Sequence, residues 1–93
     1  MKPLLLIVDD DESIRTQMKW ALANDYAVEL AETREEAVAF VHTRKPDVVL
    51  LDLGLPPHPA DASEGLLALS EMLAQAPHVK VVVITGLSEK ENA

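Results

Sequence analysis

The chain has 93 residues, of which 48% are hydrophobic and 26% are charged, and its formal net charge is −8. This length allows one domain, and the acidic balance argues against direct nucleic-acid binding by this segment, because phosphate contacts need clustered Lys and Arg. The absence of cysteine excludes disulfides and thiolate metal sites, and no apolar run is long enough to span a membrane, so we expect a cytoplasmic protein with no membrane partner.

Strands and helices are predicted to alternate along the whole chain. In order, they are a strand over residues 4–8, a helix over 12–23, a strand over 27–31, a helix from Thr33 to Lys45, a strand over 48–51, a helix capped by Ser63 and ended by Pro77, and a strand over 80–84. Runs rich in Val, Ile and Leu are typical of strands that are buried on both faces. The alternation predicts an α/β fold with a parallel sheet and right-handed crossovers.

Local signals support these helices. Thr33 and Glu36 form a capping box at the start of the second helix, and Pro46 pushes the residue before it out of the helical region. Trp20 lies off the apolar face of the first helix, where we expect a partly exposed packing residue. The apolar face of the third helix is expected to consist of Leu66, Leu69, Leu73 and Ala76.

Short polar side chains follow three of the predicted strands. Asp9 and Asp10 follow the first strand, Asp52 follows the third, and Thr85-Gly86 follows the fourth. Parallel strands end at one edge of a sheet, where the ligands of open α/β sheets bind, so these groups are expected to meet. Two ionised carboxylates at such a short distance repel each other by about 4 kcal/mol at an effective dielectric of about 20. A hard cation such as Mg²⁺ would relieve this repulsion.

Together, these motifs resemble the receiver domain of bacterial two-component response regulators. The matching segments are Leu6-Ile7-Val8-Asp9-Asp10, Asp52-Leu53-Gly54-Leu55-Pro56 and Val83-Ile84-Thr85-Gly86. The resemblance implies a doubly wound, flavodoxin-like sheet with strand order 2-1-3-4. It also implies that residues 1–93 are a truncated receiver domain, which lacks the fifth strand and the last helices of the family.

The resemblance assigns a role to each residue of the site. Asp52 is expected to be the phosphoacceptor, and Thr85 is expected to be the switch hydroxyl that swings toward the phosphoryl group. The expected Mg²⁺ ligands are Asp9, Asp10, Asp52 and the backbone carbonyl of Gly54.

The implied function is two-component signal transduction by a phosphoacceptor domain that is not an enzyme. A histidine kinase would supply the phosphoryl group, and the aspartyl phosphate would switch a downstream output domain, expected to regulate transcription. Two alternatives stay open. A Mg²⁺-dependent phosphatase with an aspartate nucleophile would need an acidic residue where Gly54 stands, and a pseudo-receiver would act only as an interaction module.

Two features depart from the family pattern. The proline-rich loop between Asp52 and Gly65 is longer than usual, and it resembles the loop of NtrC-type regulators linked to PEP-CTERM protein sorting. The family's lysine, which follows a fifth strand, has no match before Ala93. Without that strand, residues 81–84 would be an unpaired apolar edge. We therefore expect either further residues beyond Ala93 or a homodimer that pairs this edge with a second copy.

Overall fold

The fold is given by a computed structural model that describes residues 1–55 and 62–84. Within these ranges the chain forms a single four-stranded parallel sheet in the order β2-β1-β3-β4, which confirms the predicted order. The strands are β1 (Leu4–Val8), β2 (Ala27–Ala31), β3 (Val48–Asp52) and β4 (Lys80–Ile84). The helices are α1 (Glu12–Leu22), α2 (Arg34–Arg44) and α3 (Ser63–Gln75). Thr85, Gly86 and most of the proline-rich loop lie outside the described residues.

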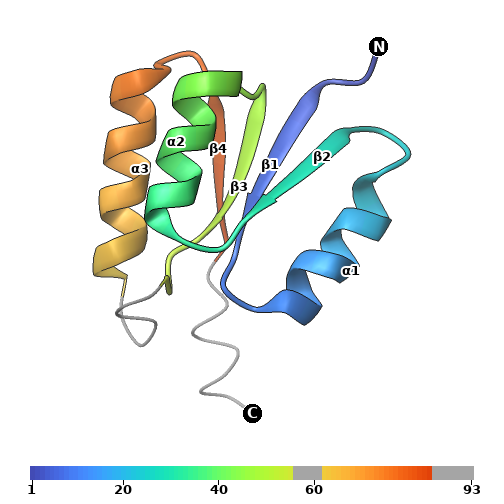
Figure 1. Ribbon diagram of the computed structural model, residues 1–93, viewed down its shortest axis with the longest axis horizontal. Helices are drawn as coiled ribbons and strands as arrows, with labels where there is room; N and C mark the ends of the chain where they lie inside the picture. The colour runs from blue at the N-terminus through green and yellow to red at the C-terminus, as the bar shows by residue number, and fades with distance from the viewer. Residues whose placement is uncertain (56–61, 85–93) are drawn as a thin grey trace.

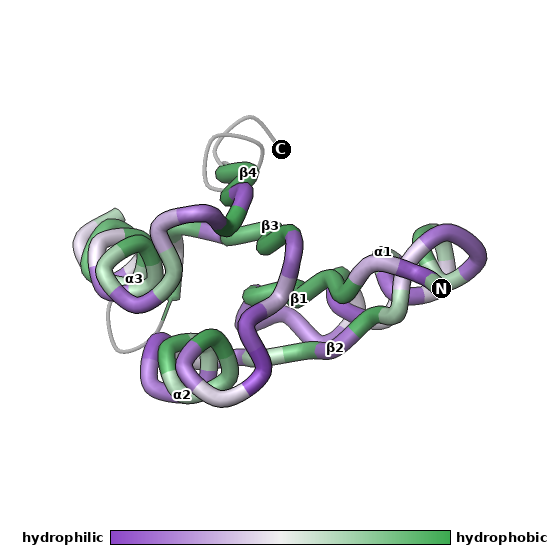
Figure 2. Tube along the Cα trace, turned by 90° about the horizontal axis from the view of Figure 1, so that it is seen from above, coloured by the Kyte–Doolittle hydropathy of each residue, from purple (hydrophilic) through white to green (hydrophobic). Residues whose placement is uncertain are grey.

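The helices cover the two faces of the sheet unequally. α2 and α3 lie side by side on one face, and α1 lies on the other (Figure 1). Seen along the strands, α1 lies beneath one end of the sheet and leaves β3 and β4 uncovered on that face by any described helix (Figure 2). Accordingly, α1 has no buried residue, and Trp20 is exposed rather than packed. None of the described helices is long and apolar enough to cross a membrane.

The main core lies between the sheet and the pair formed by α2 and α3. Its fully buried side chains are Leu6 and Val8 of β1, Val49 and Leu51 of β3, Leu55 in the loop after β3, Ala37 and Val41 of α2, and Ala68 and Met72 of α3. The two central strands contribute alternate residues to this face, as the twofold repeat of a strand requires. Burial on both faces of β1 and on one face of β3 fixes the strand ends that carry the acidic residues.

The ends of α2 follow the sequence signals. The Oγ1 atom of Thr33 accepts a hydrogen bond from the N–H of Glu36 at 3.1 Å, and the carboxylate of Glu36 accepts one from the N–H of Glu32 at 2.9 Å. The helix ends at Lys45, which has a left-handed φ of 49° and donates its N–H to the carbonyl of Val41. This conformation stops the helix just before Pro46, as the sequence predicted.

One expectation for α3 was wrong, and a second was right for only two of four residues. Ala62 is the N-cap, without a side-chain capping hydrogen bond, and Ser63 is the first helical residue. The fully buried face consists of Glu64, Gly65, Ala68 and Met72. Of the predicted residues, Leu69 and Ala76 are partly buried against the core, whereas Leu66 and Leu73 are exposed. The reason is that Gly65 lies directly against the backbone of Leu53. That close approach turns the stripe of smaller residues toward the sheet and the leucines away from it.

Candidate functional site

Three carboxylates meet at the carboxyl edge of the two central strands. Val8 of β1 is in register with Leu51 of β3, so the residues that follow them, Asp9 and Asp52, lie beside each other. Asp9, Asp10 and Asp52 each offer one oxygen, and these oxygens lie within 4.8 Å of one another. Asp9 is only 3% exposed and Asp52 only 6%. The structure therefore confirms that these three side chains converge, whereas Thr85 lies outside the described residues.

The backbone around Asp9 is held from three directions. Its N–H donates to the carbonyl of Ala31 at 3.0 Å, and its carbonyl accepts a hydrogen bond from the Nη1 atom of Arg15 at 2.8 Å. Its Oδ1 atom accepts the N–H of Asp11 at 2.9 Å. Asp11 itself caps α1, because its Oδ1 atom accepts the N–H of Ile14 at 3.1 Å. The carboxylate of Asp11 is thus committed to the helix, which separates its role from that of Asp9.

A tight turn after β3 orients Asp52. The Oδ1 atom of Asp52 accepts the N–H of Gly54 at 3.0 Å. The carbonyl of Leu53 accepts two further N–H groups, from Leu55 at 3.0 Å and from Gly65 at 3.2 Å. Asp52 is therefore fixed by its own turn, and that turn is fixed by the first residues of α3.

Burial and the neighbouring charges shift the pKa of Asp9. Burial, and to a lesser degree the charges of Asp52, Asp10 and Asp11, raises the pKa of Asp9 from 3.8 to about 6, although the hydrogen bond from the N–H of Asp11 opposes the shift. A raised carboxyl pKa means that the ionised form lacks sufficient compensation where it lies. A cation placed between the three carboxylates would provide that compensation.

The donor set fits Mg²⁺. This cation prefers oxygen ligands, and it typically binds one or two carboxylates while retaining waters or phosphate oxygens in its remaining positions. Three carboxylate oxygens at this spacing can serve one cation directly or through its bound water. Asp9, Asp10 and Asp52 are the only group of three or more such side chains at metal-binding distance within residues 1–55 and 62–84.

The sequence reasoning missed a third buried acid, Glu64 of α3. Its carboxylate accepts a hydrogen bond from the Nε atom of Arg34 at 2.7 Å, and the same guanidinium donates through Nη1 to Glu71 at 2.6 Å. Both hydrogen bonds raise the pKa of Arg34 above its ordinary value. Arg34 and Glu64 each lie near a predicted helix start. Nothing in the sequence, however, indicates that these two residues, 30 positions apart, form an ion pair.

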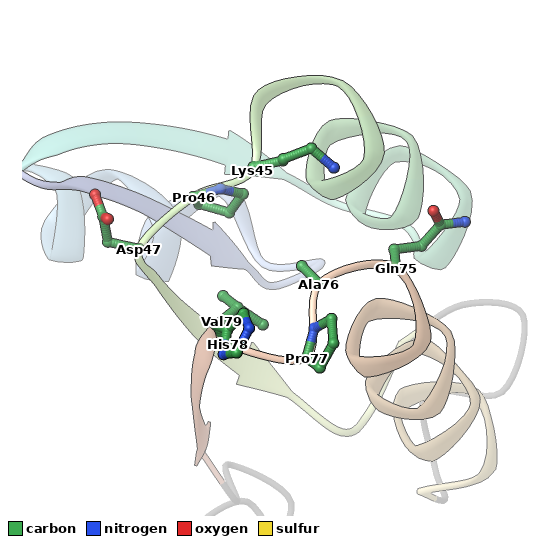
Figure 3. A pocket seen from close by; sticks show the side chains of 8 residues that line it. All are labelled: Lys45, Pro46, Asp47, Gln75, Ala76, Pro77, His78 and Val79. Carbon is green, nitrogen blue, oxygen red and sulfur yellow. The ribbon is translucent and has the colours of Figure 1, made fainter.

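A cavity of about 340 Å³ lies at the opposite end of the sheet from the acidic cluster (Figure 3). It is lined by the residues that connect α2 to β3 and α3 to β4, which are Lys45, Pro46, Asp47, Gln75, Ala76, Pro77, His78 and Val79. The carboxylate of Asp47 accepts the N–H of Leu4 at 2.8 Å, so it serves the start of β1. This cavity is not the candidate reactive site, because the three converging carboxylates lie at the other edge of the sheet.

Residues 5–93 match the family described as the response regulator receiver domain. The KDP operon transcriptional regulatory protein KdpE of Escherichia coli (strain K12) is 37% identical over 89 residues, which cover 95% of this chain and 37% of that protein. KdpE of Staphylococcus aureus is 35% identical over 92 residues, with coverage of 98% and 37%. The chain thus spans well under half the length of these relatives.

Solved structures share the fold. A CheY-like response regulator receiver domain protein from Methanospirillum hungatei aligns with a TM-score of 0.83 at 31% identity, covering 92% of this chain and 66% of that one. NtrX from Brucella abortus aligns with a TM-score of 0.78 at 30% identity, covering 89% of this chain and 18% of that one.

Proposed function

The chain belongs to the family of response regulator receiver domains, and from this membership we propose that it accepts a phosphoryl group on Asp52 in two-component signalling. The observation that carries this proposal is the convergence of Asp9, Asp10 and Asp52 within 4.8 Å at the carboxyl edge of the sheet. Asp52 is the carboxylate at the end of a central strand, and its Oδ1 atom is oriented by the N–H of Gly54. A nucleophile held in this way can meet a phosphoryl donor in a defined direction.

In the proposed reaction, a carboxylate oxygen of Asp52 attacks the phosphorus of a phosphohistidine on the kinase. The new O–P bond forms as the N–P bond breaks, and the histidine nitrogen leaves with its electron pair. Asp9 and Asp10 would hold Mg²⁺ together with Asp52 and the carbonyl of Gly54. When bound, the cation would offset negative charge on the phosphoryl oxygens, which is the main requirement of phosphoryl transfer.

We propose further that the phosphorylated domain acts on an output domain that regulates transcription, with a histidine kinase as the partner and the cytoplasm as the location. The KdpE relatives, which are named as transcriptional regulators, support this assignment. The structural likeness to NtrX supports a link to NtrC-type regulators, as does the long loop before α3. Thr85 is proposed as the switch hydroxyl. The acidic surface of this segment does not favour direct nucleic-acid binding.

Phosphorylation with labelled acetyl phosphate in the presence of Mg²⁺ tests this function. We expect the wild-type protein to take up label and the Asp52→Asn variant to take up none. Asp11→Asn is the matched control, because Asp11 lies beside the site but caps α1, and asparagine is an equally good cap. The control should be labelled normally.

The labelling assay, together with two further measurements, separates the alternatives. Label on Asp52→Asn at the wild-type level would show that Asp52 is not the acceptor. No label on the wild type, together with no binding of beryllofluoride and Mg²⁺, would favour a pseudo-receiver. Continuous release of inorganic phosphate from many phosphomonoesters would favour a phosphatase. The sequence argues against this alternative, because Gly54 stands where such a phosphatase needs an acidic residue.

A further inference from the structure

One arginine joins the N-terminal ends of two helices beside the acidic cluster. Arg34 is the first residue of α2, and its guanidinium donates to Glu64 at 2.7 Å and to Glu71 at 2.6 Å, both on α3. The two acids differ sharply in surroundings, since the side chain of Glu64 is 8% exposed and that of Glu71 is 45% exposed. Glu64 is therefore the partner for which loss of Arg34 costs more, because a buried carboxylate left without its ion-pair partner is destabilising.

The residue after Glu64 is in backbone contact with the loop that follows the acceptor. The N–H of Gly65 donates to the carbonyl of Leu53 at 3.2 Å. A Cβ atom at Gly65 would lie 2.3 Å from the Cα atom of Leu53, so the two backbones touch with no space for a side chain. Leu53 connects Asp52 to Gly54. Any movement of the first turn of α3 is thus transmitted directly to the acceptor and to the proposed carbonyl ligand.

The same arginine is tied to the other side of the cluster. Arg34 follows closely after Ala31, the last residue of β2, and the carbonyl of Ala31 accepts the N–H of Asp9 at 3.0 Å. Arg34 is therefore close in the chain to the segment that positions Asp9, while its guanidinium binds the helix end that contacts the turn after Asp52. Its planar fork holds two carboxylates in fixed directions, which a single point charge would not do.

We propose that Arg34 and Glu64 are positioning residues for the metal and phosphoryl site. This inference rests on the proposed function of Asp52. The ion pair fixes the rotation and depth of the first turn of α3, and through Gly65 it fixes the Leu53–Gly54 peptide beside Asp52. When Arg34 is removed, the carboxylate of Glu64 moves toward water, the helix end moves with it, and the oxygens that surround the cation separate.

The test is Mg²⁺ binding, measured by calorimetry with Mg²⁺ alone as the probe, at a temperature where every variant is folded. We expect Arg34→Met and Glu64→Gln each to weaken binding by about tenfold, the lower end of what outer partners contribute to metal affinity. The double variant should bind no more weakly than the weaker single variant, because both act through one ion pair. Arg34→Lys, which keeps the charge but not the fork, should recover only part of the affinity.

Glu71→Gln is the matched control, because it removes a second acid from the same guanidinium without touching the residue before Gly65. It should lower the melting temperature without changing Mg²⁺ affinity. Amide hydrogen exchange gives an independent readout at Leu55 and Gly65, whose N–H groups both bond to the carbonyl of Leu53. Exchange at these two positions should accelerate in Arg34→Met and Glu64→Gln and stay unchanged in Glu71→Gln.

Three results would overturn the inference. The first is wild-type Mg²⁺ affinity in Arg34→Met or Glu64→Gln. The second is an additive loss in the double variant, which would mean that the two residues act separately. The third is an equal loss of Mg²⁺ affinity in Glu71→Gln, which would mean that the ion pairs of Arg34 only hold the two helices together. Absence of Mg²⁺ binding by the wild-type protein would instead remove the proposed function itself, together with this inference.

Discussion

Replacing Gly65 by alanine should destabilise the fold, because the added methyl group would collide with backbone rather than with a movable side chain. Its Cβ atom would lie 2.3 Å from the Cα atom of Leu53 and 2.4 Å from the carbonyl oxygen of Leu53. Carbon atoms in contact are separated by about 3.5–4.0 Å. The first turn of α3 and the loop after β3 must therefore move apart by about 1 Å or more, and the hydrogen bond from Gly65 to Leu53 must lengthen.

The change in the free energy of unfolding is the sum of two destabilising contributions and one stabilising contribution. Forcing an extra methyl group into a packed site costs about 1–3 kcal/mol, and weakening a buried hydrogen bond costs about 0.5–1.5 kcal/mol. Alanine returns about 1 kcal/mol because it is a better helix former than glycine. We therefore expect the free energy of unfolding to fall by about 1–3 kcal/mol, which a domain with a total stability of about 5–15 kcal/mol can survive.

Urea denaturation followed by circular dichroism measures this change, with the midpoint lowered and the slope m unchanged. Ser70→Ala is the control, since Ser70 is an exposed residue of the same helix and gains helix propensity without a clash. Its free energy of unfolding should stay level or rise. A Gly65→Ala protein at least as stable as the wild type would show that α3 does not lie against Leu53 as described.

The remaining predictions concern pH and the lifetime of the phosphate. Without Mg²⁺, the free energy of unfolding should rise as the pH falls from 7 to 5, because the pKa of Asp9 is about 6 in the folded protein against a model value of 3.8. The folded state then binds the proton more tightly, and the gain between pH 7 and pH 5 is about 1 kcal/mol. Urea denaturation across this range measures it, and Asp9→Asn or saturating Mg²⁺ should flatten the profile; a wild-type profile that falls toward pH 5 contradicts the reasoning. In receiver domains, the residues two positions after the acceptor and after the threonine influence hydrolysis, and here Gly54 and Leu87 cannot orient a water molecule. The aspartyl phosphate should therefore decay slowly in a chase experiment, and decay as fast as in a chemotaxis-type receiver would rule this out.

The sheet and the acidic cluster were predictable because both depend on short-range patterns. Apolar runs located the strands within a residue, and the convergence of Asp9 with Asp52 followed once the strands were parallel, since parallel strands end at the same edge. The strand order came from the family resemblance, and the structure confirms it. No composition or periodicity argument would have supplied that order.

The packing of α3 was not predictable, because it depends on a contact between distant backbones. Hydrophobicity alone favoured Leu66 and Leu73 as the buried face, yet Gly65 and Ala68 face the core. Small residues there permit a closeness to Leu53 that leucine would prevent. The pairing of Arg34 with Glu64 was equally hidden, since the chain has 16 acidic residues and any of them was a formal candidate.

The arrangement of the strands explains why an unfavourable cluster of charges persists in the folded chain. The backbones of Asp9 and Asp52 are held side by side, because β1 and β3 are paired in register and the residues just before the two acids, Val8 and Leu51, have fully buried side chains. Their backbone and turn hydrogen bonds hold them further, so the site does not open, and burial, with a smaller contribution from the neighbouring charges, raises the pKa of Asp9. A cation that binds there would find its oxygen ligands already close together. Relief of the repulsion between these carboxylates would add to the free energy of binding. The buried core between β1, β3 and the α2–α3 pair would thus contribute to the affinity of the proposed cation site by holding its oxygens in place beforehand.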